Sequence, residues 1–458
     1  MRARLLISGL LLLSISHILN AQADTLQGIK KDISGFVRTG AYGNLHKGSE
    51  TFLPTVFSDL GVRAVAGNGS TFRAVGDFRF RYGTEFSETV SGAEVREAYV
   101  SLNGSRWDFS AGQKIIKWGR ADFTNPTSKF NPINTVCRSL DNEDLDLGNI
   151  AAQVRIYPAN AFSVEFVAVP FYRSSELITK PLKLPSYVNI REIDSLVTGN
   201  DYVSLGIKGT LHFGGIDMSL SCFNGYDPMP GTRLRNFSLD LSGPLPVAKI
   251  DLEMTPYRIW NLGADFETAA GSVGLRGEAA FSIPYKSWKD FEYVPLKELK
   301  WAGGADWSSG NFSITAEYSG KCIPGFVPPA AGSVIGTDID MGALAAMMAV
   351  PGFDINEFIK EEVSAFNRLY NYQAKQYYHS ISAKLQEELF YGRATPSLFV
   401  QYNFTSRDLI LMPQVVMKPF DGISVTIGAD IYSGRKGSLF DMVDDVLDCV
   451  KAGVRVDF

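Results

Sequence analysis

Charged side chains recur at every second position in several segments of the chain. Arg73, Asp77, Arg79 and Arg81 form the densest of these runs. Residues two apart lie on one face of an extended strand, so the run would present a charged face. In a water-filled pore, charges on the wall select solutes by sign. The pattern predicts these pore-lining residues: Arg73, Asp77, Arg79, Arg81, Arg155, Lys208, Arg276, Glu278 and Glu317.

Two interpretations of this charged face stay open. Inward positions of a barrel are polar simply because they meet water. Alternatively, Arg73, Arg79 and Arg81 make one wall electropositive, which would favour anionic solutes.

The segment 117–148 places basic residues before acidic ones, and we expect it to be the third loop at the end that carries long loops. Folded inward, it would narrow a pore and set a transverse field across it. Otherwise it is a solvated external loop. Its candidate constriction residues are Lys117, Arg120, Arg138, Asp141, Glu143 and Asp144.

Other chemistry finds little support in the sequence. The acidic run 141–146 does not match an EF-hand loop, because Leu145 replaces an oxygen ligand and the glycine is missing. We therefore expect no metal and no cofactor. His46, His212 and His379 lack a recognisable nucleophile motif, and a lone histidine is no catalytic triad. We predict that the protein is not an enzyme.

Strict apolar–polar alternation predicts the elements that position these residues. The segments 72–82, 150–157, 203–213, 273–283 and 423–432 alternate over about the 9–11 residues that a tilted transmembrane strand needs. The last residues, 450–458, alternate and end in Phe458, which resembles the signal read by the outer-membrane assembly machinery. The alternation thus predicts an all-β fold.

Connection lengths separate a membrane barrel from a soluble β-sandwich. Short turns near residues 67, 103, 158, 214, 308 and 419 alternate with long segments near 43–54, 117–148, 172–201, 285–297, 322–375 and 434–447. Short turns at one end and long loops at the other are typical of outer-membrane barrels. We predict a transmembrane antiparallel β-barrel of about eighteen strands, with sixteen to twenty allowed. The region 234–267 is hard to divide, because Pro256 fits either a tight hairpin or an irregular strand.

The segment 322–375 is the longest interruption of the strand pattern. Phe353, Phe358, Phe366 and Leu369 have the spacing of an amphipathic helix. A structureless loop of this length would be unusual. We expect a partly helical insert, either an external cap on the barrel rim or a lid or plug.

The start of the chain predicts export. A basic segment, an apolar run from Leu5 to Leu19 and Ala21-Gln22-Ala23 form a secretory signal. We expect residues 1–23 to be the signal peptide and 24–458 the barrel. The net charge of −5 gives no basic character that would suggest nucleic acid. Four scattered cysteines allow either free thiols or two disulfides.

Several stretches resemble one family of outer-membrane proteins. The segment 112–119 (GQKIIKWG) with 131–134 (NPIN), the stretches 262–266 and 275–280, and the tail 397–428 are similar to porin-like barrels encoded beside RND-type exporters, which are distantly similar to alginate-export barrels. This resemblance implies a channel or export role for apolar or anionic cargo, and no catalytic residues.

Two function classes follow. The first is an outer-membrane channel or export conduit for small anionic or hydrophobic solutes. The second is a non-transport barrel that acts as a scaffold or partner subunit through its long loops. Expected partners are outer-membrane lipid, the barrel-assembly machinery and, as a further candidate, a periplasmic or inner-membrane exporter.

Overall fold

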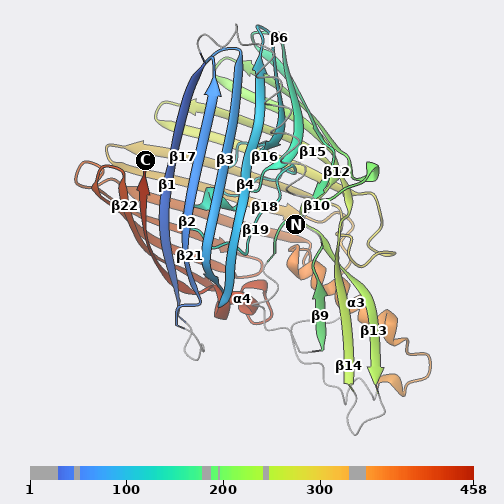
Figure 1. The fold of residues 1–458 in the computed structure, drawn as a ribbon. Helices are drawn as coiled ribbons and strands as arrows, with labels where there is room; N and C mark the ends of the chain where they lie inside the picture. The colour runs from blue at the N-terminus through green and yellow to red at the C-terminus, as the bar shows by residue number, and fades with distance from the viewer. Residues whose placement is uncertain (1–28, 46–51, 178–186, 194–195, 241–246, 330–346) are drawn as a thin grey trace.

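The protein folds as a closed antiparallel barrel of 18 strands (Figure 1). The computed structural model describes residues 29–45, 52–177, 187–193, 196–240, 247–329 and 347–458; the predicted signal peptide and His46 lie outside them. The barrel strands are β1 Lys30–Asn44, β2 Thr55–Gly67, β3 Phe72–Glu85, β4 Glu88–Asn103, β5 Trp107–Lys114, β6 Asn149–Ala159, β7 Phe162–Val169, β11 Ser204–Phe213, β12 Ile216–Tyr226, β15 Arg258–Ala270, β16 Val273–Pro284, β17 Glu298–Ser309, β18 Phe312–Cys322, β19 Tyr377–Glu387, β20 Ala394–Asn403, β21 Leu409–Phe420, β22 Ile423–Ser433 and β23 Cys449–Asp457. The predicted fold class and strand number are confirmed.

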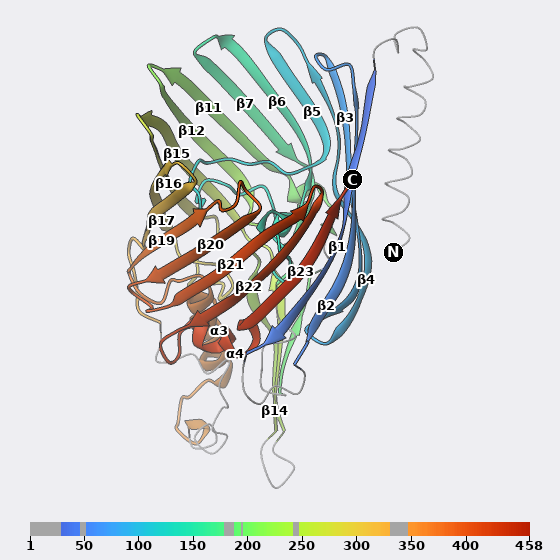
Figure 2. The same ribbon diagram turned by 90° about the vertical axis from the view of Figure 1, so that its left-hand side faces the viewer.

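Each barrel strand pairs with its neighbours in chain order, and β23 closes the ring on β1 (Figure 2). The closing register runs from Phe36 opposite Asp457 to Asn44 opposite Cys449. Gly35 and Phe458 add a reciprocal pair of backbone hydrogen bonds at 2.8 and 2.9 Å. Closure satisfies the N–H and C=O groups that an open sheet edge would leave unpaired in lipid.

The outward face of the barrel is apolar. Leu205, Ile207, Leu211 and Phe213 of β11 are 40–73% exposed, and they alternate with Lys208 and other inward residues. The same alternation holds on β3, where Phe80 and Tyr82 are exposed and Asp77 is buried. A lipid-facing band and a polar lumen therefore follow from the period of two in the sequence. Among the described residues, no helix is both long and apolar enough to cross a membrane.

The short turns lie where the sequence predicts them. Strands β11 and β12 are joined by Gly214 and Gly215, with φ of 58° and 84°, a backbone conformation that glycine adopts without steric cost. The opposite end carries the long connections. They include the pair β8 Tyr172–Arg173 and β10 Leu196–Val197, the 3₁₀ helices at Asn142–Leu145 and Asn200–Tyr202, and α4 Leu439–Leu447.

Three of these connections build a unit beyond the barrel, which we call the cap (Figure 1). Its sheet consists of β13 Gly231–Asp240, β14 Val247–Thr255 and β9 Val188–Arg191, with β9 parallel to β14. The helix α3 Ile355–Tyr370 packs against this sheet and confirms the partly helical insert. The start of that insert, 330–346, lies outside the described residues.

Apolar burial stabilises the cap. Ile250 and Leu252 of β14 are at most 1% exposed, and they pack against Ile359 and Val363 of α3. Asp354 caps the helix by accepting hydrogen bonds from the backbone N–H groups of residues 356 and 357. Pro256 lies between β14 and β15, where the chain passes from the cap to the barrel, so neither expected placement is correct. Lacking an N–H group, proline suits this break between two sheets.

Candidate functional site: a loop folded into the lumen

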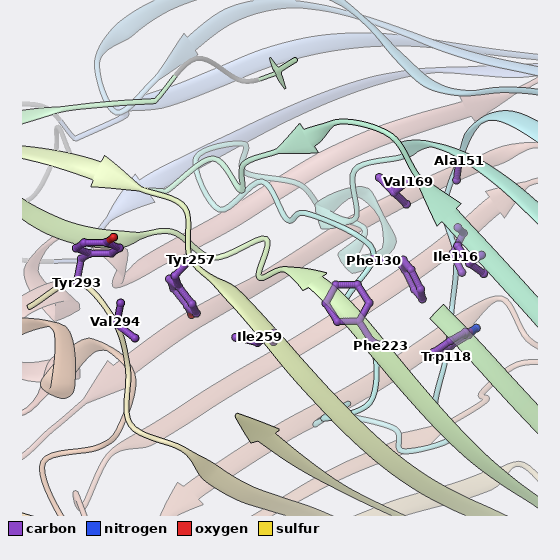
Figure 3. Packing of buried hydrophobic residues seen from close by; sticks show 11 residues of the cluster. Ile116, Trp118, Phe130, Ala151, Val169, Phe223, Tyr257, Ile259, Tyr293 and Val294 are labelled. Atoms are coloured by element: carbon purple, nitrogen blue, oxygen red, sulfur yellow. The ribbon is translucent and has the colours of Figure 1, made fainter. Parts of the chain in front are cut away.

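Residues 115–148 connect β5 to β6 and fold into the barrel; we call this segment the inner loop. Its first half packs on inward-facing apolar residues of the wall (Figure 3). Trp118 and Phe130 are each 2% exposed, with ring centroids 4.7 Å apart in an edge-to-face arrangement. The Trp118 indole also donates a 2.6 Å hydrogen bond to Glu165 of β7. This packing fixes the loop against β6, β7 and β12.

Two wall carboxylates bind the backbone of the inner loop. Glu278 of β16 accepts from the N–H groups of Arg120, Ala121 and Thr127 at 2.7–3.1 Å. Glu317 of β18 accepts from the N–H groups of residues 122, 123 and 124 at 2.9–3.0 Å. Hydrogen bonds to an ionised acceptor are stronger than neutral ones. Two predicted pore-lining residues thus fix the path of the loop across the lumen.

Ion pairs strengthen the same contact. Arg120 reaches Asp265 and Glu267 of β15 at 2.8 and 2.7 Å. Asp122 pairs with Arg276 of β16 at 2.6 Å. The first half of the inner loop therefore forms ion pairs with two neighbouring strands. It provides the positive partner on β15 and the negative partner on β16.

The second half of the inner loop is anchored on a different part of the barrel wall, the N-terminal strands β1, β3 and β4. Asp144 lies 2.7–2.9 Å from three guanidinium groups, those of Arg38 on β1, Arg79 on β3 and Arg96 on β4; we call these four residues the Asp144 cluster. Leu140 packs beside Tyr42 and Phe57. The predicted acidic run therefore pairs with arginine. Among the described residues, no group of His, Cys, Asp and Glu is placed to bind a metal.

Burial alone would raise the pKa of Asp144, but Arg38 and Arg79 outweigh it and lower the pKa to about 2. A carboxyl whose folded pKa is depressed stabilises the structure above its unfolded pKa of about 4. That contribution is lost as the pH falls toward about 2. We expect the inner loop to stay docked at neutral pH and to loosen between about pH 4 and about pH 2. Single-channel recordings over that pH interval should show the loosening of the inner loop as larger fluctuations of the current. The substitution Asp144→Asn should abolish this pH dependence.

The arginines of β3 do not form a bare positive wall. Arg79 pairs with Asp144, and Arg81 lies 2.6 Å from Asp59 and also contacts Glu85. Carboxylates from β2 and from the inner loop thus compensate the charges of these arginines. Asp77 is a further carboxylate on this wall, and it pairs with Arg63. Sequence alternation alone could not show Asp59 and Asp144 as neighbours, because they come from β2 and from the inner loop.

A hollow of about 250 Å³ lies between β3 and β6 and includes Arg73, Lys114, Arg155, Asp108 and Tyr99 in its lining; we call it the basic hollow. Arg155 pairs with Glu165. Lys114 donates to Gln153 at 2.6 Å and to Ser110 at 3.2 Å. Within the described part of the chain, neither Lys114 nor Arg73 forms an ion pair with a carboxylate. The hollow therefore retains more positive than negative charge.

The remaining predicted residues have varied surroundings. Lys208 lies 3.3 Å from Asp265, and Arg138 donates to the carbonyl of residue 446 at 2.8 Å. Lys117 is 63% exposed and Asp141 pairs with Arg455 at 3.5 Å. The side chain of Glu143 lies outside the described residues.

Some contacts of the site escaped sequence analysis. Sequence analysis did not predict four inward residues of alternating strands as part of the site: Arg38, Asp59, Glu165 and Asp265.

The histidines contact polar neighbours on the barrel. His212 contacts Asp217 at 2.6 Å and His379 contacts the Tyr318 hydroxyl at 2.6 Å. The four cysteines are free thiols.

The closed ring, the apolar outer band and the inner loop define an outer-membrane β-barrel. Among solved structures, the fold is similar to OccAB1 of Acinetobacter baumannii, with a TM-score of 0.51 and 9% identity over 93% of this chain and 96% of that one. It is also similar to OccD3 (OpdP) of Pseudomonas aeruginosa, with a TM-score of 0.52 and 8% identity over 93% of this chain and 91% of that one. No family model and no curated protein matches the sequence.

Proposed function

We propose that the protein is a channel of the bacterial outer membrane whose lumen is constricted by the inner loop. The observation that supports this most is the docking of that loop inside the ring, through Glu278 and Glu317 on one side and the Asp144 cluster on the other. A ring of 18 strands is wide enough to leave an aqueous lumen unless something fills it. A loop fixed across such a lumen sets its narrowest passage.

We further propose that the solutes are small and anionic or hydrophobic. Arg73 and Lys114 of the basic hollow form no ion pair with a carboxylate among the described residues, and they support anion preference, because a wall with surplus positive charge attracts anions. Export of such solutes through an attached periplasmic or inner-membrane exporter is a narrower form of the same proposal. The short-turn end of the barrel would then face that partner.

Reversal potentials in planar bilayers test the charge preference. Under a salt gradient we expect the wild-type channel to prefer anions, and the double substitution Arg73→Gln, Lys114→Gln to move the reversal potential toward zero, because it removes the surplus cations. Lys436→Gln, in the connection between β22 and β23, is the control and should leave the potential unchanged. A clear cation preference of the wild type would overturn the proposal.

A second function has its own supporting observation. The cap is a folded sheet-and-helix unit beyond the barrel, and a scaffold or partner subunit would use such a unit to bind another protein. Single-channel conductance separates the two functions. A purified barrel that never conducts would favour the scaffold.

A further inference from the structure

Arg258 is a cation on the lipid-facing side of the barrel, at the end that carries the long connections. It begins β15 and shares one face of that strand with the exposed Trp260 and Leu262. Ile259 and Asn261, which alternate with them, are at most 2% exposed and face inward. The alternation therefore places the Arg258 guanidinium outside the ring, beyond the apolar band. A charge on the lipid face of a barrel is costly at the middle of the membrane and tolerated near its surfaces.

No carboxylate compensates Arg258 within the described part of the chain. Its guanidinium donates to the side-chain oxygen of Asn224 at 2.6 and 3.2 Å and to the carbonyl of residue 201 at 3.5 Å. It also lies over the rings of Tyr226 and Tyr285, at 5.6 and 5.7 Å from their centroids. These neutral partners orient the side chain and leave its charge uncompensated.

Two lysines continue this positive charge along the rim. Lys297 is exposed between buried neighbours just before β17, and Lys375 is exposed two residues before the start of β19. One row of paired residues crosses the strands at this level: Leu262, Phe281, Leu299, Cys322 and Tyr377. Lys297 and Lys375 are each two residues beyond that row, and Arg258 is four. Among the residues that the structure describes, neither lysine lies within 4.0 Å of a carboxylate oxygen.

The three cations Arg258, Lys297 and Lys375, which we call the rim cluster, come from alternate strands. Around the ring they belong to β15, β17 and β19, with one strand between each pair. Neighbouring strands are about 4.8 Å apart, so adjacent cations are about 10 Å apart. One small anion cannot contact all three, whereas a layer of phosphate groups can.

Aromatic side chains indicate that this level is the membrane surface. Trp260 and Tyr285 are 42% and 54% exposed, and their rings stack with centroids 6.2 Å apart. Trp and Tyr are enriched where the hydrocarbon of a membrane meets its headgroups. Farther along the same face of β15, Leu262 and Phe266 are 46% and 44% exposed. A ligand with an anionic head and apolar tails therefore matches the surface at both levels.

We propose that the rim cluster binds phosphate groups of lipid headgroups in the outer leaflet of the membrane. Cationic side chains at a membrane surface attract anionic headgroups, and arginine donates to phosphate oxygens through charge-assisted hydrogen bonds. The acyl chains of the same lipid would lie on Leu262 and Phe266. The site is outside the barrel, so it does not depend on conduction through the lumen.

Native mass spectrometry of the full chain released from detergent micelles tests this proposal. Diphosphoryl lipid A is the probe, and lipid A stripped of both phosphates presents the acyl chains alone. We expect the wild type to bind the phosphorylated lipid more tightly. A cation near a membrane surface contributes about fivefold in affinity, so the triple substitution Arg258→Gln, Lys297→Gln, Lys375→Gln should reduce that preference about a hundredfold. Binding of the stripped lipid should stay unchanged, which also checks that the variant is folded.

The matched control removes three exposed cations from other connections at the same end of the barrel, with Arg407→Gln, Arg435→Gln and Lys436→Gln. It should keep the preference for the phosphorylated lipid. An equal loss in this control would assign the effect to the overall charge of the rim and overturn the site. Equal binding of both lipids by the wild type would overturn it too. Complete displacement of the lipid by millimolar inorganic phosphate would show that the cluster binds a free anion instead.

Discussion

Deleting residues 121–146 and joining the ends with a short glycine linker should raise the single-channel conductance several-fold. The deleted residues include the backbone bound by Glu278 and Glu317 and the Asp144 that pairs with three arginines. Without them the lumen of an 18-strand ring loses the segment that crosses it. The wall carboxylates and arginines then become hydrated, so the barrel itself should still fold. Single-channel recording measures the conductance, and circular dichroism checks the fold.

The control for this deletion removes a long segment outside the lumen. Replacing 232–254, the β13–β14 hairpin of the cap, with a short linker should change conductance much less than loss of the inner loop does. Unchanged conductance after deletion of 121–146 would contradict the constriction. A similar rise for both deletions would assign the effect to the outer mouth of the barrel.

Asp144→Ala should release the second half of the inner loop. The substitution leaves the cluster arginines without their shared carboxylate, and Arg38 is only 2% exposed. Removing one partner of a buried ion pair costs about 3–5 kcal/mol when the other charge stays uncompensated. The cost here should be smaller, because Arg38 keeps its ion pair with Asp59 at 2.6 Å. We expect trypsin to cut the intact barrel after Arg138, in the released half of the loop, far faster than in the wild type. Mass spectrometry of the fragments measures the rates.

Asp141→Asn is the control for this experiment. Asp141 belongs to the same loop, but it is 44% exposed and pairs with Arg455 at 3.5 Å. An exposed pair of this kind contributes about 0–1 kcal/mol, so cleavage should stay near the wild-type rate. Equal cleavage of Asp144→Ala and Asp141→Asn would show that the cluster does not hold the loop.

The barrel was predictable because its two faces meet different solvents. Lipid outside and water inside impose a period of two, which residues such as Phe80 and Arg81 display directly in the sequence. The same period of two gives a wrong prediction at the cap, where strands outside the barrel also alternate. Strands β13 and β14 also alternate, so sequence analysis could not separate them from barrel strands. The helix α4 was expected only as part of a long loop, although Ser438 and the apolar spacing of 439–447 were available as signals.

The contacts of the site were beyond sequence analysis for a different reason. Arg120 meets Asp265, 145 positions away, and the Asp122 N–H meets Glu317, 195 positions away. Such pairs depend on how far the loop reaches across the ring, which no local pattern encodes. Arg79 and Arg81 show the consequence, since their charges are visible in the sequence and their partners are not.

The core of the cap combines residues from its three connections, and α4 from a fourth connection of the barrel packs against it. Val188 follows β7, Ile250 follows β12, Ile359 follows β18, and Met442 of α4 precedes β23. Segments that share one core must change together during evolution, because a substitution in one alters the packing of the others. Exchanging a single loop between related barrels should therefore expose apolar surface, whereas transplanting all four segments as a set should preserve a folded outer face.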